Sequence, residues 1–305
     1  MKKYKKVYIE ITNICNLNCS FCPGHKRAPK EMSASEFKTV LDKTRHIGEN
    51  FYLHLMGEPT AHSQFDEILD ICNSCNIRPN ITTNGTLLAK QAQTILVKDV
   101  RNVSISLHSF EANNLNKSLQ DYLENITDFC KKAIGSRTVI ELRLWNMSRE
   151  SLADNSSFNR KIIEFLRENL NLDFDIYQKI NETFFAMEAN RKKNFRLKDN
   201  IFLGMSEQFS WPSVEASPNK ICKGFCYGLR NQIAILADGT VVPCCLDSNG
   251  DMALGNIFEE SIESIVNSKR AKSIYDGFTN HKAVEPLCQS CGYIKNICSS
   301  KKYKM

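Results

Sequence analysis

Residues 6–22 read KVYIEITNICNLNCSFC, a strand-like segment that runs directly into three closely spaced cysteines. Apolar and β-branched residues dominate residues 6–12, which predicts a buried β-strand. Cys15, Cys19 and Cys22 then fall on the loop after the carboxyl end of this strand. Parallel α/β folds place their active sites on that side of the sheet. Three thiolates on one loop can bind three irons of a cubane 4Fe-4S cluster and leave the fourth iron open to substrate.

The cysteine loop alone leaves other chemistry open. A structural zinc site needs four ligands, and His25 follows the three cysteines closely enough to be the fourth. Redox-active thiols are a further alternative. The loop therefore indicates a metal or redox site, and the rest of the chain must distinguish these readings.

Strand-like and helix-like segments alternate through the first two-thirds of the chain. The spacing of apolar residues predicts strands at 6–12, 51–56, 80–83, 102–108, 139–145 and 173–177, and helices at 33–46, 63–75, 87–97, 119–134 and 158–170. Ser33 and Glu36 resemble a capping box at the start of the first helix. Six strands that alternate with helices predict a parallel α/β sheet, either a barrel-like wrap or a doubly wound sheet.

The alternation stops near residue 180. Residues 181–217 carry a charged run and the turn-prone Trp211-Pro212-Ser213, and we interpret them as a connector. A hairpin is expected at 232–242 around Asp238-Gly239, followed by short helices at 262–267 and 271–275 and a cysteine-rich tail. The expected domains are therefore 1–180, the connector 181–217, and 218–305.

Composition limits the classes of function. The 305 residues are 42% hydrophobic with a formal net charge of +6, and the lysines are scattered, so neither a nucleic-acid nor a membrane partner is expected. The chain begins without an apolar signal segment, which predicts a cytoplasmic protein. Thirteen cysteines in such a chain favour metal or redox chemistry over disulfides.

The cysteine loop resembles the defining motif of the radical S-adenosylmethionine (SAM) superfamily, Cys-x3-Cys-x2-Cys with an aromatic residue before the third cysteine. Four later segments resemble family motifs in the same order. The turn at 56–59 resembles a Gly-Gly-Glu motif with methionine at its first position, and the turn at 82–85 resembles a Thr-Asn-Gly turn. A Ser-x-Ser strand and a strand with an arginine follow. The residues that this resemblance assigns to the cofactor are Phe21, Met56, Gly57, Glu58, Thr83, Asn84, Ser104, Ser106 and Arg143.

The resemblance implies a partial (β/α)6 TIM-type barrel over residues 1–180. It implies that Cys15, Cys19 and Cys22 hold a 4Fe-4S cluster that cleaves SAM reductively. An external one-electron reductant, flavodoxin or ferredoxin, would supply the electron. The products would be methionine and a 5′-deoxyadenosyl radical, which abstracts a hydrogen atom from the substrate.

Seven cysteines form a second group, namely Cys222, Cys226, Cys244, Cys245, Cys288, Cys291 and Cys298. With the Asp238-Gly239 hairpin, they resemble the SPASM/twitch extension of radical SAM enzymes, a small α+β domain. The spacing Cys288-x2-Cys291-x6-Cys298 fits the shorter twitch form, which implies one auxiliary 4Fe-4S cluster on Cys226, Cys244, Cys288 and Cys291. A zinc ribbon remains an alternative for these four.

The other cysteines are expected to have different roles. Cys245 follows Cys244 on a predicted strand and should point to the opposite face. Cys222 and Cys298 are candidate hydrogen-atom donors. The remaining three cysteines, Cys72, Cys75 and Cys130, are expected to pack in the core.

The substrate is not fixed by the cysteines. Modification of a peptide or protein side chain is one hypothesis, although the fourteen residues before Cys15 leave no room for a fused leader-binding domain. Oxidation of a small hydroxylated metabolite, such as an aminocyclitol, is the second, and a non-enzymatic electron carrier or zinc protein is the third. Asp247 and Cys222 are the catalytic candidates. Other polar groups that could act on substrate are His54, His108, Tyr177 and Arg230.

Overall fold

The computed structural model of the chain describes residues 3–147, 155–185, 193–208, 210–215 and 223–294. It contains two compact units. The first unit comprises residues 1–16, 23–79 and 209–305, and the second comprises residues 17–22 and 80–208. The chain therefore passes from one unit to the other, and back, within the cysteine loop.

The first unit is built on a short mixed sheet. Its strand order is β10 (Gly255–Asn256), β9 (Thr240–Val242), β8 (Gln232–Ile235), β1 (Lys6–Ile9) and β2 (Phe51–Tyr52). β1 pairs in parallel with both β2 and β8, whereas β8 and β9 form the expected antiparallel hairpin. β1 therefore lies inside this sheet, and its carboxyl end leads into the cysteine loop.

Helices and short helical turns complete the first unit: α1 (Ala34–Thr44), η1 (Pro59–Ala61), α2 (Phe65–Ser74), α7 (Ile262–Val266), α8 (Lys269–Thr279) and α9 (Pro286–Ser290). The expected capping box is confirmed at α1, where Ser33 accepts the Glu36 N–H and Glu36 accepts the Ser33 N–H. Phe37, Val40 and Leu41 are fully buried on one face of α1. This apolar face anchors the segment that follows the cysteine loop.

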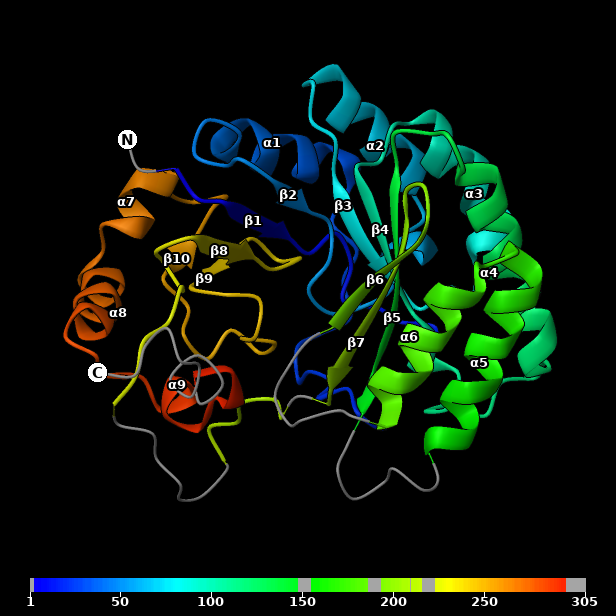
Figure 1. Cartoon of the computed structure of the whole chain (residues 1–305). Coiled ribbons are helices and arrows are strands. Elements are labelled where there is room, and N and C mark those ends of the chain that lie inside the picture. The colour runs from blue at the N-terminus through cyan, green and yellow to red at the C-terminus, as the bar shows by residue number, and fades with distance from the viewer. Residues whose placement is uncertain (1–2, 148–154, 186–192, 209, 216–222, 295–305) are drawn as a thin grey trace. The chain divides into compact units, whose positions relative to one another are not determined.

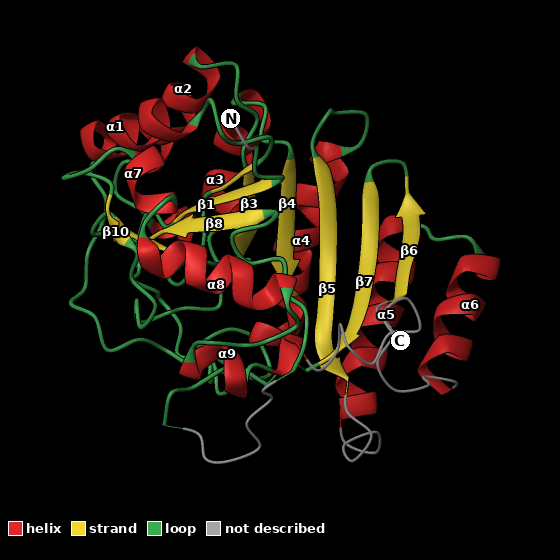
Figure 2. Cartoon of the chain, turned by 90° about the vertical axis from the view of Figure 1, so that its left-hand side faces the viewer, coloured by secondary structure: helices red, strands yellow, loops and turns green. Residues whose placement is uncertain are grey.

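The second unit is a sheet of five strands in the order β3 (Asn80–Thr83), β4 (Asn102–Ser106), β5 (Val139–Met147), β7 (Ile201–Glu207) and β6 (Lys193–Lys198), as Figure 2 shows. The first four run parallel, and β6 pairs antiparallel at the edge. The turn η2 (Leu107–Ser109) follows β4. The helices are α3 (Leu88–Val97), α4 (Leu119–Ala133), α5 (Asn155–Leu170) and α6 (Phe174–Phe185), and α3, α4 and α5 lie on one side of β3, β4 and β5 (Figure 1).

Side-chain alternation gives the sheet of the second unit one polar face. Along β5, Ile140, Leu142 and Leu144 are fully buried, and the half-buried Glu141 and Arg143 point to the other side. The buried residues face the helices. The opposite face therefore carries the groups that can contact a polar ligand.

The sixth predicted strand, 173–177, is wrong. These residues begin α6, in which Ile176, Tyr177 and Ile180 recur at helical spacing and turn toward the interior. The last parallel strand is instead β7, and both β6 and β7 lie in the segment expected to be a connector. The domain boundaries at 180 and 217 stay a prediction.

Candidate active site

The turn at Met56–Glu58 packs directly on the start of the cysteine loop. The Glu58 N–H donates to the Ile14 carbonyl oxygen at 3.0 Å. Gly57 has a φ of +72°, and a Cβ placed there would lie 2.4 Å from the Thr12 carbonyl oxygen. A side chain at this position is therefore excluded by both the backbone conformation and the neighbouring chain.

The Glu58 side chain holds this turn in shape. It is 1% exposed, and its Oε1 accepts hydrogen bonds from the Thr60 N–H at 3.0 Å and the Thr60 hydroxyl at 2.6 Å. It thereby caps η1. The Glu58 carboxylate is therefore engaged by donors of the turn itself.

In the second unit, Asn113 binds the cysteine loop. Its Nδ2 donates to Cys19 Sγ at 3.1 Å, and its Oδ1 accepts the Asn18 N–H at 3.0 Å. The Cys22 N–H donates to the Cys19 carbonyl oxygen. Hydrogen bonds to cysteine sulfur tune iron–sulfur clusters, so this arrangement fits a cluster ligand.

Phe21, the aromatic residue of the motif, packs against His108 with ring centroids 4.7 Å apart. His108 is 6% exposed, and its Nδ1 lies 3.2 Å from the Arg143 carbonyl oxygen. Burial lowers the pKa of His108 to about 4; the hydrogen bond with the Arg143 carbonyl oxygen raises it and the Arg143 charge lowers it, both by less than burial does. His108 is therefore neutral at pH 7.

Stability is expected to fall as the pH drops from about 6.5 to about 4, because the unfolded histidine then binds a proton that folded His108 does not. The difference between the two pKa values corresponds to at most about 3 kcal/mol. His108→Gln should remove this part of the pH dependence. Denaturant unfolding of the apo-protein at several pH values measures it. If the free energy of unfolding depended on pH identically in both proteins, the lowered pKa of His108 would be contradicted. The difference in unfolding free energy between the two proteins at pH 7.5 gives the packing cost of the substitution.

Strand ends in the second unit bring the other predicted cofactor residues to one region. Arg143 donates to the Ser106 hydroxyl at 2.7 Å and stacks on the Trp145 ring at 4.2 Å. Ser104 donates to the Glu141 carboxylate at 2.8 Å. The sequence reasoning missed Glu141 and Trp145, although their alternation with Arg143 on β5 was a usable signal.

The turn after β3 is closed by its own side chains. Thr83 Oγ1 accepts the Gly85 N–H, and Asn84 Oδ1 accepts the Thr86 N–H and hydroxyl. Tyr122 of α4 donates its hydroxyl to the Asn84 carbonyl oxygen at 2.7 Å. Thr83 and Asn84 therefore define this turn.

The four predicted auxiliary cysteines are neighbours in the first unit. Cys226 interacts electrostatically with Cys291, Cys244 with Cys226 and Cys288, and Cys288 with Cys226 and Cys291. Burial raises the pKa of all four thiols, that of Cys226 to about 11. The Gly228 N–H lies 3.4 Å from Cys226 Sγ. A buried group of thiols with an amide donor fits a cluster better than it fits an apolar core.

The expectation for Cys245 needs correction, because Cys244 and Cys245 lie in a turn beyond β9 and not on a strand. The Tyr8 hydroxyl hydrogen-bonds to Cys245, while Cys245 also neighbours Cys291. Cys245 is thus held by a side-chain hydrogen bond from Tyr8. The candidate hydrogen donors Cys222 and Cys298 lie outside the described residues.

Asp247 shapes the loop next to the auxiliary cysteines. It is fully buried, and its two oxygens accept the Asp251 and Met252 N–H groups, each at 2.8 Å. Met252 in turn accepts a contact from the Cys288 thiol at 3.5 Å. These hydrogen bonds explain why the Asp247 carboxylate is buried: it positions the loop next to the auxiliary cysteines.

The remaining polar candidates have structural contacts. Tyr177 donates to the Glu164 carboxylate, and Arg230 lies over the Tyr275 ring at 4.2 Å. His54 packs edge-on against the rings of Tyr8 and Tyr52. Cys72 and Cys130 are fully buried as core residues, in agreement with the prediction, whereas Cys75 is half-buried.

Across the described ranges, no group of three or more His, Cys, Asp or Glu side chains is arranged to hold a single metal ion. The cluster sites are therefore supported by the grouping of thiols and their amide donors. In the same ranges, no helix is long and apolar enough to cross a membrane.

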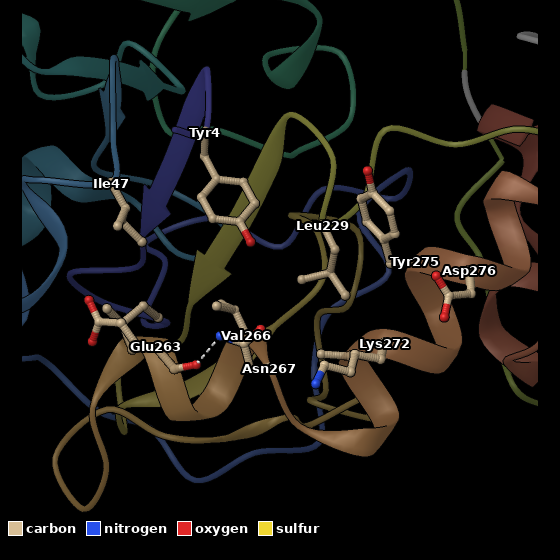
Figure 3. Close-up of a pocket in the computed structure, with 11 residues that line it drawn as sticks. Tyr4, Ile47, Leu229, Glu263, Val266, Asn267, Lys272, Tyr275 and Asp276 are labelled. Atoms are coloured by element: carbon tan, nitrogen blue, oxygen red, sulfur yellow. Dashed lines mark hydrogen bonds between the residues drawn. The ribbon is translucent and has the colours of Figure 1, made fainter. Parts of the chain in front are cut away.

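A cavity of about 380 Å³ lies elsewhere in the first unit (Figure 3). Tyr4 and Ile47, which precede β1 and β2, border it on one side, and Val266, Lys272 and Tyr275 of the α7–α8 region border it on the other. It adjoins the amino end of β1, whereas the cysteine loop follows the carboxyl end. The cavity is therefore separate from the cysteine site.

Comparison with protein families identifies two regions. The family model described as "Radical SAM superfamily" matches residues 9–150, and SPASM, described as "Iron-sulfur cluster-binding domain", matches residues 226–292. The chain belongs to the radical SAM superfamily. More specifically, it is a radical SAM enzyme with a SPASM domain, whose cofactors are SAM, a 4Fe-4S cluster and an auxiliary cluster.

Two relatives from Bacillus subtilis match most of the chain. The sporulation killing factor maturation protein SkfB is 26% identical over 84% of this chain and 63% of its own length. The antilisterial bacteriocin subtilosin biosynthesis protein AlbA is 24% identical over 97% of this chain and 68% of its own length. The chain spans less than two-thirds of the first curated relatives, with shares of 41%, 27% and 63%.

Solved structures confirm the expected fold class. BtrN in complex with AdoMet and 2-DOIA is 18% identical, with a TM-score of 0.58 over 95% of this chain and 94% of that one. Streptococcus suis SuiB bound to precursor peptide SuiA is 18% identical, with a TM-score of 0.59 over 98% of this chain and 71% of that one. The parallel sheet is not closed, which agrees with a partial barrel.

Proposed function

We propose that the chain modifies a side chain of a peptide or protein substrate by hydrogen-atom abstraction. The observation that carries this proposal is the similarity to SkfB and AlbA, which extends over 84% and 97% of the chain. Their printed names describe maturation of a killing factor and biosynthesis of a bacteriocin. The fold shared with peptide-bound SuiB is compatible with the same substrate class.

Cys15, Cys19 and Cys22 are the proposed ligands of the SAM-binding cluster, and Asn113 donates a hydrogen bond to Cys19 Sγ. The backbone at Met56–Glu58 is proposed to bind the amino group of SAM. Arg143 and Ser106, joined by a hydrogen bond, face the side where a carboxylate or ribose hydroxyl can be held. The other proposed cofactor contacts are Phe21, Thr83, Asn84 and Ser104.

Cys226, Cys244, Cys288 and Cys291 are the proposed ligands of the auxiliary cluster. When bound, SAM and its cluster would supply the 5′-deoxyadenosyl radical that removes a hydrogen atom from the substrate, and the auxiliary cluster would take up the second electron of a net oxidation. An external flavodoxin or ferredoxin is the proposed reductant. The residues of this chain position the cofactor and substrate and exclude water.

A radical dehydrogenase of a small hydroxylated metabolite is the second candidate. The cysteine spacing at 288–298 favours it, because it fits a single auxiliary cluster. The substrate therefore has to be assigned by experiment.

Anaerobically reconstituted protein with dithionite and SAM is expected to form 5′-deoxyadenosine. A precursor peptide encoded beside the gene should stimulate this, and deuterium at the attacked side chain should appear in the 5′-deoxyadenosine. Stimulation by an aminocyclitol alone would support the dehydrogenase instead. Absence of 5′-deoxyadenosine under every condition would reject both.

A further inference from the structure

A buried ion pair closes the base of the cysteine loop. Arg27 Nη2 lies 2.7 Å from Glu10 Oε1, and the two side chains are 11% and 0% exposed. Glu10 precedes Cys15 by five residues, and Arg27 follows Cys22 by five. The pair therefore joins the two ends of the segment that carries all three cysteines.

Glu10 also binds two other parts of the first unit. Its Oε1 accepts the Met56 N–H at 3.1 Å, and its Oε2 accepts the Ala237 N–H at 2.9 Å. Met56 begins the turn proposed to bind SAM, and Ala237 lies between the hairpin strands β8 and β9. One carboxylate thus connects the proposed cofactor turn to the hairpin that leads to Cys244.

Arg27 extends these contacts to the auxiliary cysteine segment. Its Nε donates to the Ser248 carbonyl oxygen at 2.8 Å, and the neighbouring Lys26 N–H donates to Asn249 Oδ1 at 2.8 Å. Ser248 lies four residues beyond Cys244 and next to Asp247. The guanidinium therefore bridges Glu10 and the chain that presents an auxiliary ligand.

Buried ion pairs are a poor source of stability, because desolvation offsets much of their attraction and apolar residues of similar size can replace them. Their value is geometric when each group is hydrogen-bonded on several sides. We infer that Glu10 and Arg27 are positioning residues that couple the SAM-binding turn at Met56 to the auxiliary-cluster segment at Cys244. This inference rests on the proposed function: its SAM half on the proposed cofactor turn, and its auxiliary half on the proposed ligand Cys244.

The neighbouring ion pair provides a matched control. Lys26, the residue before Arg27, pairs with Glu215, and these two side chains are 75% and 72% exposed. An exposed ion pair of this kind contributes little to the stability of the fold. Lys26→Met therefore tests charge removal at the same loop without breaking the buried network.

The experiment compares Arg27→Met, Arg27→Lys, the charge-free double variant Glu10→Gln/Arg27→Met, and Lys26→Met. The first readout is the SAM dissociation constant of each variant. The second is the electron paramagnetic resonance signal of the auxiliary cluster, which is recorded in versions of the variants whose three loop cysteines are replaced by alanine. Thermal unfolding checks that each protein is folded. Arg27→Met and the double variant should bind SAM about tenfold more weakly, as expected for the loss of about one net hydrogen bond, and should show a shifted auxiliary signal. Arg27→Lys should be intermediate, and Lys26→Met should match the wild type.

The inference is overturned if the folded double variant binds SAM within about twofold of the wild type and has an unshifted signal. It is also overturned if Arg27→Met loses both properties and the double variant regains them, since the loss then reflects only an unpaired charge. Failure of the wild type to bind SAM would reject the proposed function. The auxiliary signal would still decide whether Arg27 positions the Cys244 segment.

Discussion

Replacing Cys15, Cys19 and Cys22 together with alanine is expected to abolish SAM cleavage and to leave the auxiliary site filled. The three thiols are the only ligands proposed for the SAM-binding cluster, whereas the four auxiliary cysteines are neighbours of one another within residues 226–291. The triple variant should keep about half of the wild-type iron, because one of two four-iron clusters is lost. Iron analysis and anaerobic 5′-deoxyadenosine formation, which should fall to background, measure the two effects.

Cys75→Ala is the control for cysteine loss as such. Cys75 is half-buried at the end of α2 and belongs to neither cysteine group. Its replacement should leave iron content and 5′-deoxyadenosine formation unchanged. The ligand assignment would fail if the triple variant still cleaved SAM at the wild-type rate. Loss of all iron from the triple variant would show that the auxiliary site does not fill independently.

The sequence predicts elements well where a local pattern repeats. The helices at α1, α3 and α4 are found to within two residues of their predicted ends, because their buried faces recur at helical spacing and capping residues mark two of the starts. β3 is predicted with its observed bounds. Such elements can be predicted from the pattern within about ten consecutive residues.

The errors occur where distant partners decide the structure. β6 reads KNFRLK, and its charged residues give no strand signal; it forms because it pairs with β7 at the sheet edge, where charged side chains remain solvated. The segment at 173–177 alternates over too few residues to distinguish a strand from the first turn of α6. Local patterns cannot supply such long-range pairing.

The same limit applies to the site. The cysteines are recognisable because their spacing is local, and their assignment to two groups follows from it. The contacts of Arg27 with Glu10 and of Asn113 with Cys19 join residues 17 and 94 positions apart. The sequence around Arg27 or Asn113 does not predict these partners. The cofactor could therefore be predicted from the sequence, whereas the groups that position it could be identified only in the structure.

Gly57→Ala is expected to weaken SAM binding by about 10- to 100-fold, because it displaces the turn proposed to hold the cofactor's amino group. The φ of +72° costs an L-residue about 1–2 kcal/mol. The new Cβ would also lie 2.4 Å from the Thr12 carbonyl oxygen, a backbone atom that cannot move without shifting the cysteine loop. Overpacking of this kind adds about 1–3 kcal/mol.

Gly135→Ala separates these two costs. Gly135 has a φ of +77°, but a Cβ there meets no atom within 4 Å. It should therefore show the conformational cost alone, with normal SAM affinity, while Gly57→Ala should lose more stability and also lose affinity. Thermal unfolding and SAM titration of both variants measure this difference. Equal affinities for Gly57→Ala and the wild type would mean that SAM does not depend on the Met56–Glu58 turn, and the cofactor would have to be placed on the strand ends of the second unit alone.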